Sequence, residues 1–128
     1  KGKCAYVNRV RMTSAQIIQH IKKAGGIAVL AHPFELRVAE QRQLEAIIEQ
    51  LADEGLEGLE VYSSCHSPAA IKCYERLADT FHLVRTGGSD YHGATKPQVK
   101  MGYIGKNIIL DSGCISAIKE RISQRALF

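Results

Sequence analysis

Histidine and carboxylate side chains stand at two points of the sequence where a metal site could form. The segment "GGSDYHG" places Asp90 and His92 two positions apart, and His32 precedes a proline in "IAVLAHP". Residues two apart in an extended segment point to the same side, so Asp90 and His92 are expected to reach one centre. Imidazole together with carboxylate is a usual ligand set for zinc, manganese or iron in hydrolytic sites. The sequence thus indicates a metal site at His32, Asp90 and His92.

Each of these residues also has a purely structural interpretation. A histidine before proline is commonly a loop residue whose hydrogen bonds are satisfied, and Ser-Asp after two glycines is favourable turn chemistry. From the residue types alone, a polar turn and half of a metal site both remain open. His20 and His82 are excluded from the candidate site by their positions in the predicted elements.

Helical and extended patterns alternate along the chain and determine where the candidate ligands lie. Helices are predicted from Thr13 to about Gly25, over roughly 38–54, from Ser67 to about Phe81, and after Asp111 or Ser112. Apolar runs in "IAVLAHP", "GLEVY" and "HLVRT" predict three strands. The first and last helices are predicted to face inward through Ile17, Ile18, Ile21, Ile115, Ile118 and Ile122. This alternation predicts an α/β fold with a parallel sheet covered by helices.

Polar residues follow all three predicted strands, at the edge of a parallel sheet where ligands usually bind. They are His32 after the first strand, Ser63, Ser64 and His66 after the second, and Ser89, Asp90 and His92 after the third. We therefore expect these side chains to converge, with the serines acting as turn or supporting residues.

The composition limits the classes of protein to which the chain can belong. It has 128 residues, of which 45% are hydrophobic and 23% charged, as expected for one globular domain. The net charge of +4 favours an anionic ligand such as a phosphate ester, but it fits a merely soluble surface equally well. No apolar run approaches the roughly 18–20 residues that span a bilayer. The four cysteines form no CxxC pair, which favours reduced thiols and a cytoplasmic location.

Several motifs resemble those of the PHP (polymerase and histidinol phosphatase) family of metal-dependent phosphoesterases. In chain order they are "GGIAVLAHP", "GLEGLEVYSSCHSP" and "GGSDYHG", the last followed by "KP" and "MG". The branch that they most resemble contains nucleoside 3',5'-bisphosphate phosphatases and a 5'-to-3' exoribonuclease, RNase AM. The opening "GKCAYVNRVRMT" also resembles the segment that leads from that branch's helical insertion back into the barrel.

The resemblance implies roles for five residues. It implies that His32, Asp90 and His92 are metal ligands, that His66 faces the cleft, and that Lys96 lies where a basic residue meets a phosphate. A loop histidine without a partner and a solvated lysine remain the alternatives for His66 and Lys96. The implied cofactors are divalent zinc, manganese or iron ions, up to three in the intact family site. No nucleophilic side chain is required, because a metal-bound water attacks the phosphate.

The resemblance also implies that the chain is a part of a larger fold. A family member is a distorted (β/α)7 barrel whose early motifs, including an HxH pair, do not occur in this sequence. We therefore expect a single partial PHP domain, with residues 1–12 as a connector and 13–128 as the helix-strand repeats of the C-terminal portion. Such a fragment is expected to have weak or no activity alone and to be able to self-associate through exposed sheet edges.

Three hypotheses for the function follow. The resemblance implies hydrolysis of phosphate esters in the intact protein, with a nucleotide, an oligonucleotide or a small phosphate ester as substrate and no membrane partner. The alternative is a binding or regulatory module that retains the PHP fold without chemistry. A third hypothesis, nucleic-acid binding through basic charge alone, predicts strong salt dependence and no dependence on metal.

Overall fold

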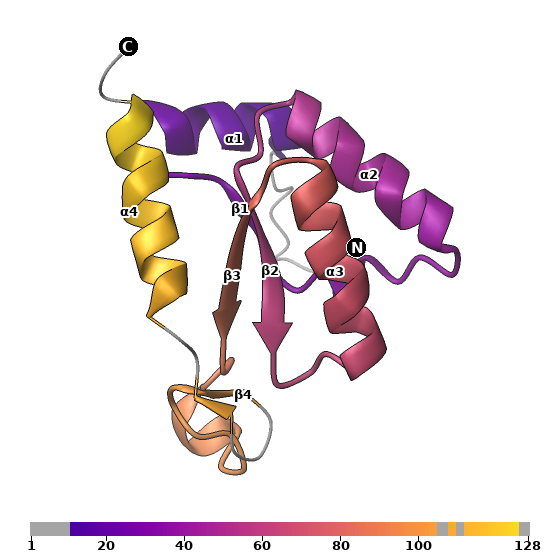
Figure 1. The fold of residues 1–128 in the computed structure, drawn as a ribbon, viewed down its shortest axis with the longest axis vertical. Helices are drawn as coiled ribbons and strands as arrows, with labels where there is room; N and C mark the ends of the chain where they lie inside the picture. Colours follow the sequence, from indigo (N-terminus) through magenta and orange to yellow (C-terminus); the bar gives the residue numbers. More distant parts are fainter. Residues whose placement is uncertain (1–10, 105–107, 110–111, 126–128) are drawn as a thin grey trace, which may run out of the picture.

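A computed structural model describes residues 11–104, 108–109 and 112–125 of the chain. Most of the predicted connector, residues 1–12, lies outside the described residues. Helices and strands follow one another as drawn in Figure 1: α1 (Ser14–Lys23), β1 (Val29–Leu30), the 3₁₀ helix η1 (Pro33–Leu36), α2 (Gln41–Asp53), β2 (Gly58–Ser63), α3 (Pro68–Thr80), β3 (Val84–Gly88), the 3₁₀ helix η2 (Gly93–Thr95), β4 (Tyr103–Ile104), β5 (Ile108–Ile109) and α4 (Gly113–Arg125).

The central sheet is parallel and has the strand order β1-β2-β3. Gly58 at the start of β2 pairs with Val29 on one side and Val84 on the other. A Cβ atom at Gly58 would lie 2.9 Å from Val29 Cγ2 and 3.2 Å from the Val84 carbonyl oxygen. Glycine therefore permits the three strands to approach closely at this point. The separate β4-β5 pair is antiparallel.

Two helices begin at side-chain caps that the sequence predicts. The Thr13 hydroxyl accepts a hydrogen bond from the Gln16 backbone, and the Gln16 side chain accepts one from the Thr13 backbone, as the capping-box spacing predicts. At α3 the Ser67 hydroxyl accepts the Ala70 N–H, with Pro68 in the first turn. These caps fix the points at which the chain leaves the preceding loops.

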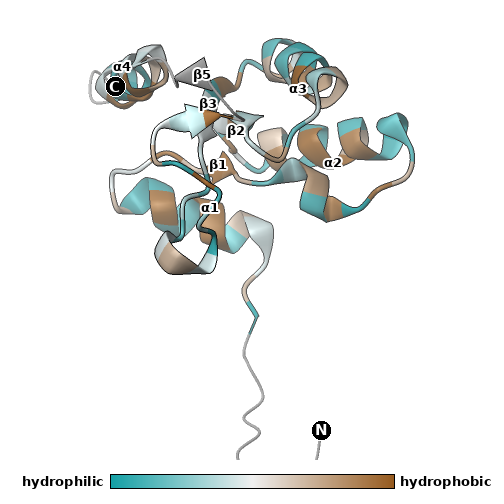
Figure 2. Cartoon of the chain, turned by 90° about the horizontal axis from the view of Figure 1, so that it is seen from below, coloured by the Kyte–Doolittle hydropathy of each residue, from teal (hydrophilic) through white to brown (hydrophobic). Residues whose placement is uncertain are grey.

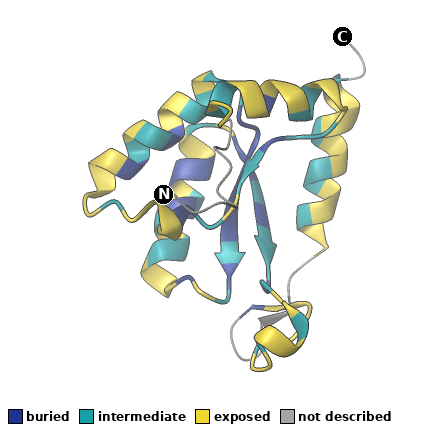
Figure 3. Cartoon of the chain, turned by 180° about the vertical axis from the view of Figure 1, so that it is seen from behind, coloured by how far each residue is buried: buried dark blue, intermediate teal, exposed yellow. Residues whose placement is uncertain are grey.

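The core lies between the sheet and the helices that cover it. Figure 2 shows apolar segments of α1, α2 and α3 turned toward the strands, and Figure 3 shows the strands largely buried beneath more exposed helices. Its buried hydrophobic residues are Ile18, Ala28, Leu44, Ile48, Leu56, Leu59, Val61, Tyr74, Leu77, Ala78 and Leu83. α3 packs on β2 and α4 on β3, so the predicted α/β fold with a helix-covered parallel sheet is confirmed.

Some predicted details of the helices are wrong. The second helix does not start near Val38, because residues 37–40 after η1 are not helical and α2 begins only after Glu40. Ile17, Ile115 and Ile122 are exposed rather than inward. α4 packs on β3 with no buried residue among those described, and Arg121 donates from it to the carbonyl oxygen of His82 at 2.8 Å.

Two further expectations concern self-association through sheet edges and the absence of a membrane span. The edge strands of the sheet are β1, with two residues, and β3, with five, and self-association through these edges stays a prediction. Among the residues that the structure describes, no helix has the length and apolar character needed to span a bilayer.

Candidate metal centre

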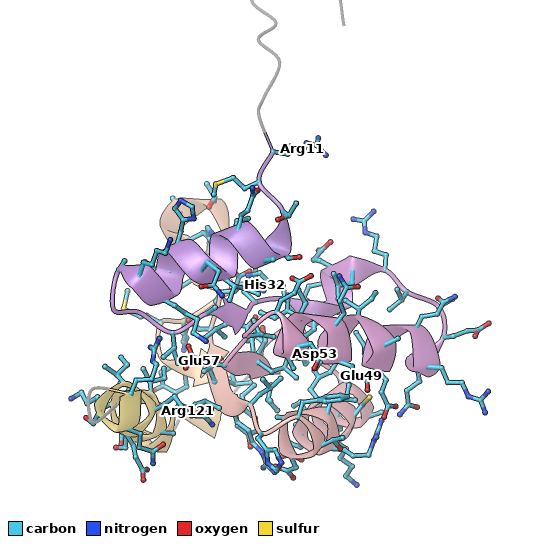
Figure 4. All side chains as sticks on the ribbon, turned by 90° about the horizontal axis from the view of Figure 1, so that it is seen from above. Arg11, His32, Glu49, Asp53, Glu57 and Arg121 are labelled. Atoms are coloured by element: carbon cyan, nitrogen blue, oxygen red, sulfur yellow. The ribbon has the colours of Figure 1, made fainter. Side chains whose placement is uncertain are left out.

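His32 leaves β1 in a left-handed turn that points its ring toward the carboxyl end of the sheet. Its φ angle is 48°, and Pro33 follows it as the first residue of η1. The backbone N–H of His32 donates to Glu60 Oε2 at 2.6 Å, and the ring Nδ1 lies 3.1 Å from the same oxygen. The His32 side chain is 40% exposed, and its second nitrogen, Nε2, is the one nearer to Asp90. Figure 4 shows His32 near the middle of the projection, whereas Arg11 extends away on the segment that leads into α1.

Asp90 follows β3 and lies opposite His32. Its Oδ1 atom is 3.8 Å from His32 Nε2, and its side chain is 15% exposed. The expectation that Asp90 and His92 share one side of an extended segment is wrong, because Asp90 has a φ angle of 56°. A left-handed turn, common for aspartate, rather than strand alternation brings the two side chains near each other.

His92 is held by its own loop. Its Nδ1 lies 2.8 Å from the backbone carbonyl oxygen of Asp90 and 3.4 Å from Asp90 Oδ1. Because a carbonyl oxygen can only accept, the hydrogen bond to it places the ring proton on Nδ1. Nε2 of His92 is then the nitrogen with a lone pair for a metal ion.

Lys96 contacts Oδ2, the other oxygen of the Asp90 carboxylate. The turn of η2 brings it back to the loop, and its ammonium donates a short hydrogen bond to Asp90 Oδ2. This bond is the largest cause of the lowered pKa of Asp90 and of the raised pKa of Lys96. In the described residues Asp90 therefore carries its negative charge beside a cation from the same loop.

An open cleft of about 450 Å³ brings these residues together. Its lining consists of His32, Phe34, Glu35, Cys65, Asp90, His92 and Lys96. Of the five predicted site residues, four therefore line one cleft at the carboxyl ends of the strands. Phe34, Glu35 and Cys65 were not predicted, since nothing in their sequence context indicates chemistry.

His66 does not line this cleft, so the expectation that it faces the cleft is not supported. It is 8% exposed, and its Nδ1 donates to the Val61 carbonyl oxygen at 2.8 Å. Its ring makes edge contacts with Phe34 and Tyr74, at centroid distances of 5.5 and 4.9 Å. The loop turns His66 inward to an aromatic cluster, and Cys65 takes the position beside the cleft.

The spacing of the facing atoms fits one divalent ion. Two ligand atoms at ~2.1 Å from a zinc ion are ~3.4 Å apart at the tetrahedral angle, and farther apart at wider angles. His32 Nε2 and Asp90 Oδ1, at 3.8 Å, satisfy this requirement, and both are donor types that zinc, manganese and iron accept. No group of three such donors converges within the described part of the chain, so the pair His32 Nε2 and Asp90 Oδ1 offers fewer ligands than a zinc site requires.

Comparison with known proteins connects this arrangement to phosphoesterases. No protein-family model matches the chain. It is 37% identical over 76 residues to the phosphoribosyl 1,2-cyclic phosphate 1,2-diphosphodiesterase of Eggerthella lenta, across 59% of this chain and 27% of that protein. It is 32% identical over 102 residues to the 5'-3' exoribonuclease Rnm of Salmonella typhimurium, across 80% and 34%. It is 32% identical over 91 residues to the 3',5'-nucleoside bisphosphate phosphatase of Chromobacterium violaceum, across 71% and 32%.

A solved structure matches the fold as well as the sequence. The crystal structure of a protein from Bifidobacterium adolescentis, described as a metal-dependent phosphoesterase, superposes with a TM-score of 0.68 at 27% identity. The match covers 94% of this chain and 40% of that one. The resemblance to the PHP family is confirmed. The chain spans about a third of the length of the curated relatives that it matches.

Proposed function

We propose that this chain is the C-terminal portion of a metal-dependent phosphoesterase, to which it contributes His32, Asp90 and His92 as metal ligands. The observation that carries the proposal is the 3.8 Å spacing between His32 Nε2 and Asp90 Oδ1 at the carboxyl end of a parallel sheet. The phosphoesterase names of the relatives support the same reaction class.

In this proposal some side chains of the cleft would bind the metal ion and one would bind the substrate. A divalent ion held there would lower the pKa of a bound water and offset the charge on the phosphoryl oxygens. His32 and Asp90 would hold the ion through Nε2 and Oδ1, and His92 would join them through Nε2. Lys96, once released from Asp90, would meet a phosphate oxygen. The cleft contributes no side-chain nucleophile in this mechanism.

The substrate class and the metal follow from the relatives and from the ligand types. Two relatives bear names for action on a nucleoside bisphosphate and on RNA from its 5' end, so we propose a nucleotide or short oligonucleotide as substrate. Zinc, manganese and iron all suit imidazole with carboxylate. A reducing, cytoplasmic location remains a prediction from the cysteine pattern.

Calorimetric titration of the chelator-treated chain with Zn²⁺ or Mn²⁺ tests the proposal. We expect binding that Asp90→Asn abolishes and that Asp53→Asn, at an exposed aspartate in α2, leaves intact. Equal binding by all three proteins, or none by the unmodified chain, contradicts it.

Hydrolysis separates the enzyme from the alternative of a binding module. We expect the 128-residue chain to release little phosphate from a nucleoside 3',5'-bisphosphate, since its described residues lack a complete ligand set. The full natural protein should release phosphate in proportion to added metal. A full protein that binds metal but hydrolyses no ester would favour the binding module.

A further inference from the structure

Glu60 is a buried carboxylate in the middle of an apolar strand, outside the predicted site. It is 7% exposed, and its neighbours in β2, Leu59 and Val61, are fully buried core residues. A buried carboxylate costs free energy unless hydrogen bonds compensate for the lost water. Within the described residues, Glu60 Oε2 accepts a hydrogen bond from the backbone N–H of His32 at 2.6 Å, and the His32 ring Nδ1 lies 3.1 Å from the same oxygen.

The contact at Nδ1 favours one tautomer of the neutral His32 ring. An ionised carboxylate only accepts hydrogen bonds, so the contact with Nδ1 favours the tautomer in which Nδ1 carries the proton. The lone pair is then on Nε2, the atom that faces Asp90 Oδ1 at 3.8 Å. In that orientation Nε2 and Asp90 are two acceptors across a gap, which a cation can fill. The second contact, to the backbone N–H, holds the left-handed turn in which His32 lies.

We propose that Glu60 is a positioning residue, which sets the tautomer and the orientation of His32 so that Nε2 is available to a metal ion. This inference rests on the proposed function only for the identity of the ion, because the tautomer is a property of the metal-free chain. Carboxylates that hold a ligand histidine in this way typically contribute 10–100-fold to metal affinity.

The test begins with the tautomer, read by long-range ¹H–¹⁵N NMR of the histidine rings in the metal-free chain. Spectra at about pH 9 report neutral rings, because the ordinary pKa of histidine is about 6.5. His32→Gln identifies the His32 signals among the five histidines. We expect the Nδ1–H form in the unmodified chain and a loss of that preference in Glu60→Gln. An Nε2–H form in the unmodified chain overturns the proposal without recourse to any variant.

Zinc titration of the same proteins supplies the second readout. We expect Glu60→Gln to bind Zn²⁺ 10–100-fold more weakly. Glu57→Gln is the matched control, since Glu57 is also 7% exposed but lies near Arg125 instead of His32, and it should keep both tautomer and affinity. Unchanged tautomer and affinity in Glu60→Gln, beside loss of zinc in Asp90→Asn, would overturn the role of Glu60 and leave the proposed function intact. If Glu60→Gln shifts the tautomer but the unmodified chain never binds zinc, the proposed function is overturned and the role of Glu60 in setting the tautomer stands.

Discussion

Asp90 contacts the Lys96 ammonium in the structure and is also a ligand of the proposed metal ion. In the structure its carboxylate accepts a hydrogen bond from Lys96, while its other oxygen faces His32 Nε2. A metal ion held between His32 and Asp90, as we propose, would share that carboxylate with the lysine ammonium or displace it. In that proposal Lys96 would oppose metal binding before it could assist a phosphate.

Replacing Lys96 by methionine should change two affinities in opposite directions. We expect Lys96→Met to bind Zn²⁺ a few-fold more tightly, because a partly exposed ion pair no longer has to be broken. Inorganic phosphate should bind the zinc-loaded variant more weakly. Calorimetry measures both affinities, and Lys100→Met, at an exposed lysine outside the cleft lining, is the control. Weaker zinc binding by Lys96→Met would show that the lysine does not compete for Asp90.

At the scale of elements, β2 positions the site because it lies between the other two strands and supplies Glu60. Its close approach to β1 and β3 depends on Gly58. A methyl group there would meet Val29 Cγ2 at 2.9 Å, so the strands would have to move apart at the base of the sheet.

Gly58→Ala should lower the free energy of unfolding by about 1–3 kcal/mol, the usual cost of overpacking. Urea denaturation followed by circular dichroism measures this change. Val29→Ala in the same chain removes the closest of the clashing atoms, so the double variant should recover part of the loss relative to the sum of the single changes. Strictly additive effects would mean that the clash with Val29 is not the cause.

Apolar spacing and cap residues predict most of the elements, but they do not predict what a loop does. The run at Gly58–Tyr62 and the caps Thr13 and Ser67 are local signals, and the structure has both caps and a strand that is one residue longer than predicted. Glu60 carries no signal of its role, because a single glutamate in an apolar strand shows neither its burial nor its partner 28 residues away. A histidine in a loop such as His66 is equally uninformative, because its direction depends on Phe34 and Tyr74.

At the scale of the whole molecule, Arg125 joins the last helix to the first half of the chain. Its guanidinium donates to the Gly26 carbonyl oxygen at 2.7 Å, 99 residues away, and lies 3.5 Å from the buried Glu57 carboxylate. The second distance is too long for a strong hydrogen bond, and Glu57 Oε2 has no hydrogen-bond partner. The contact is therefore chiefly a charge interaction across the domain.

Arg125→Met should lower the free energy of unfolding by about 1–3 kcal/mol, because it leaves a buried carboxylate without its counter-charge. Thermal unfolding measures the loss. Lys119→Met, at an exposed position of the same helix, should change stability little. If adding Glu57→Gln to Arg125→Met recovers none of the stability, the interpretation through Glu57 is wrong.

The left-handed backbone of His32 and Asp90 has a consequence for how such a sequence changes over generations. L-residues with a side chain lose about 1–2 kcal/mol in that conformation, aspartate and asparagine less than most, whereas glycine does not. Laboratory evolution that rewards only folding should therefore replace His32, and more slowly Asp90, with glycine. A lineage that keeps both residues retains them at a cost in stability, and their persistence would record selection for chemistry.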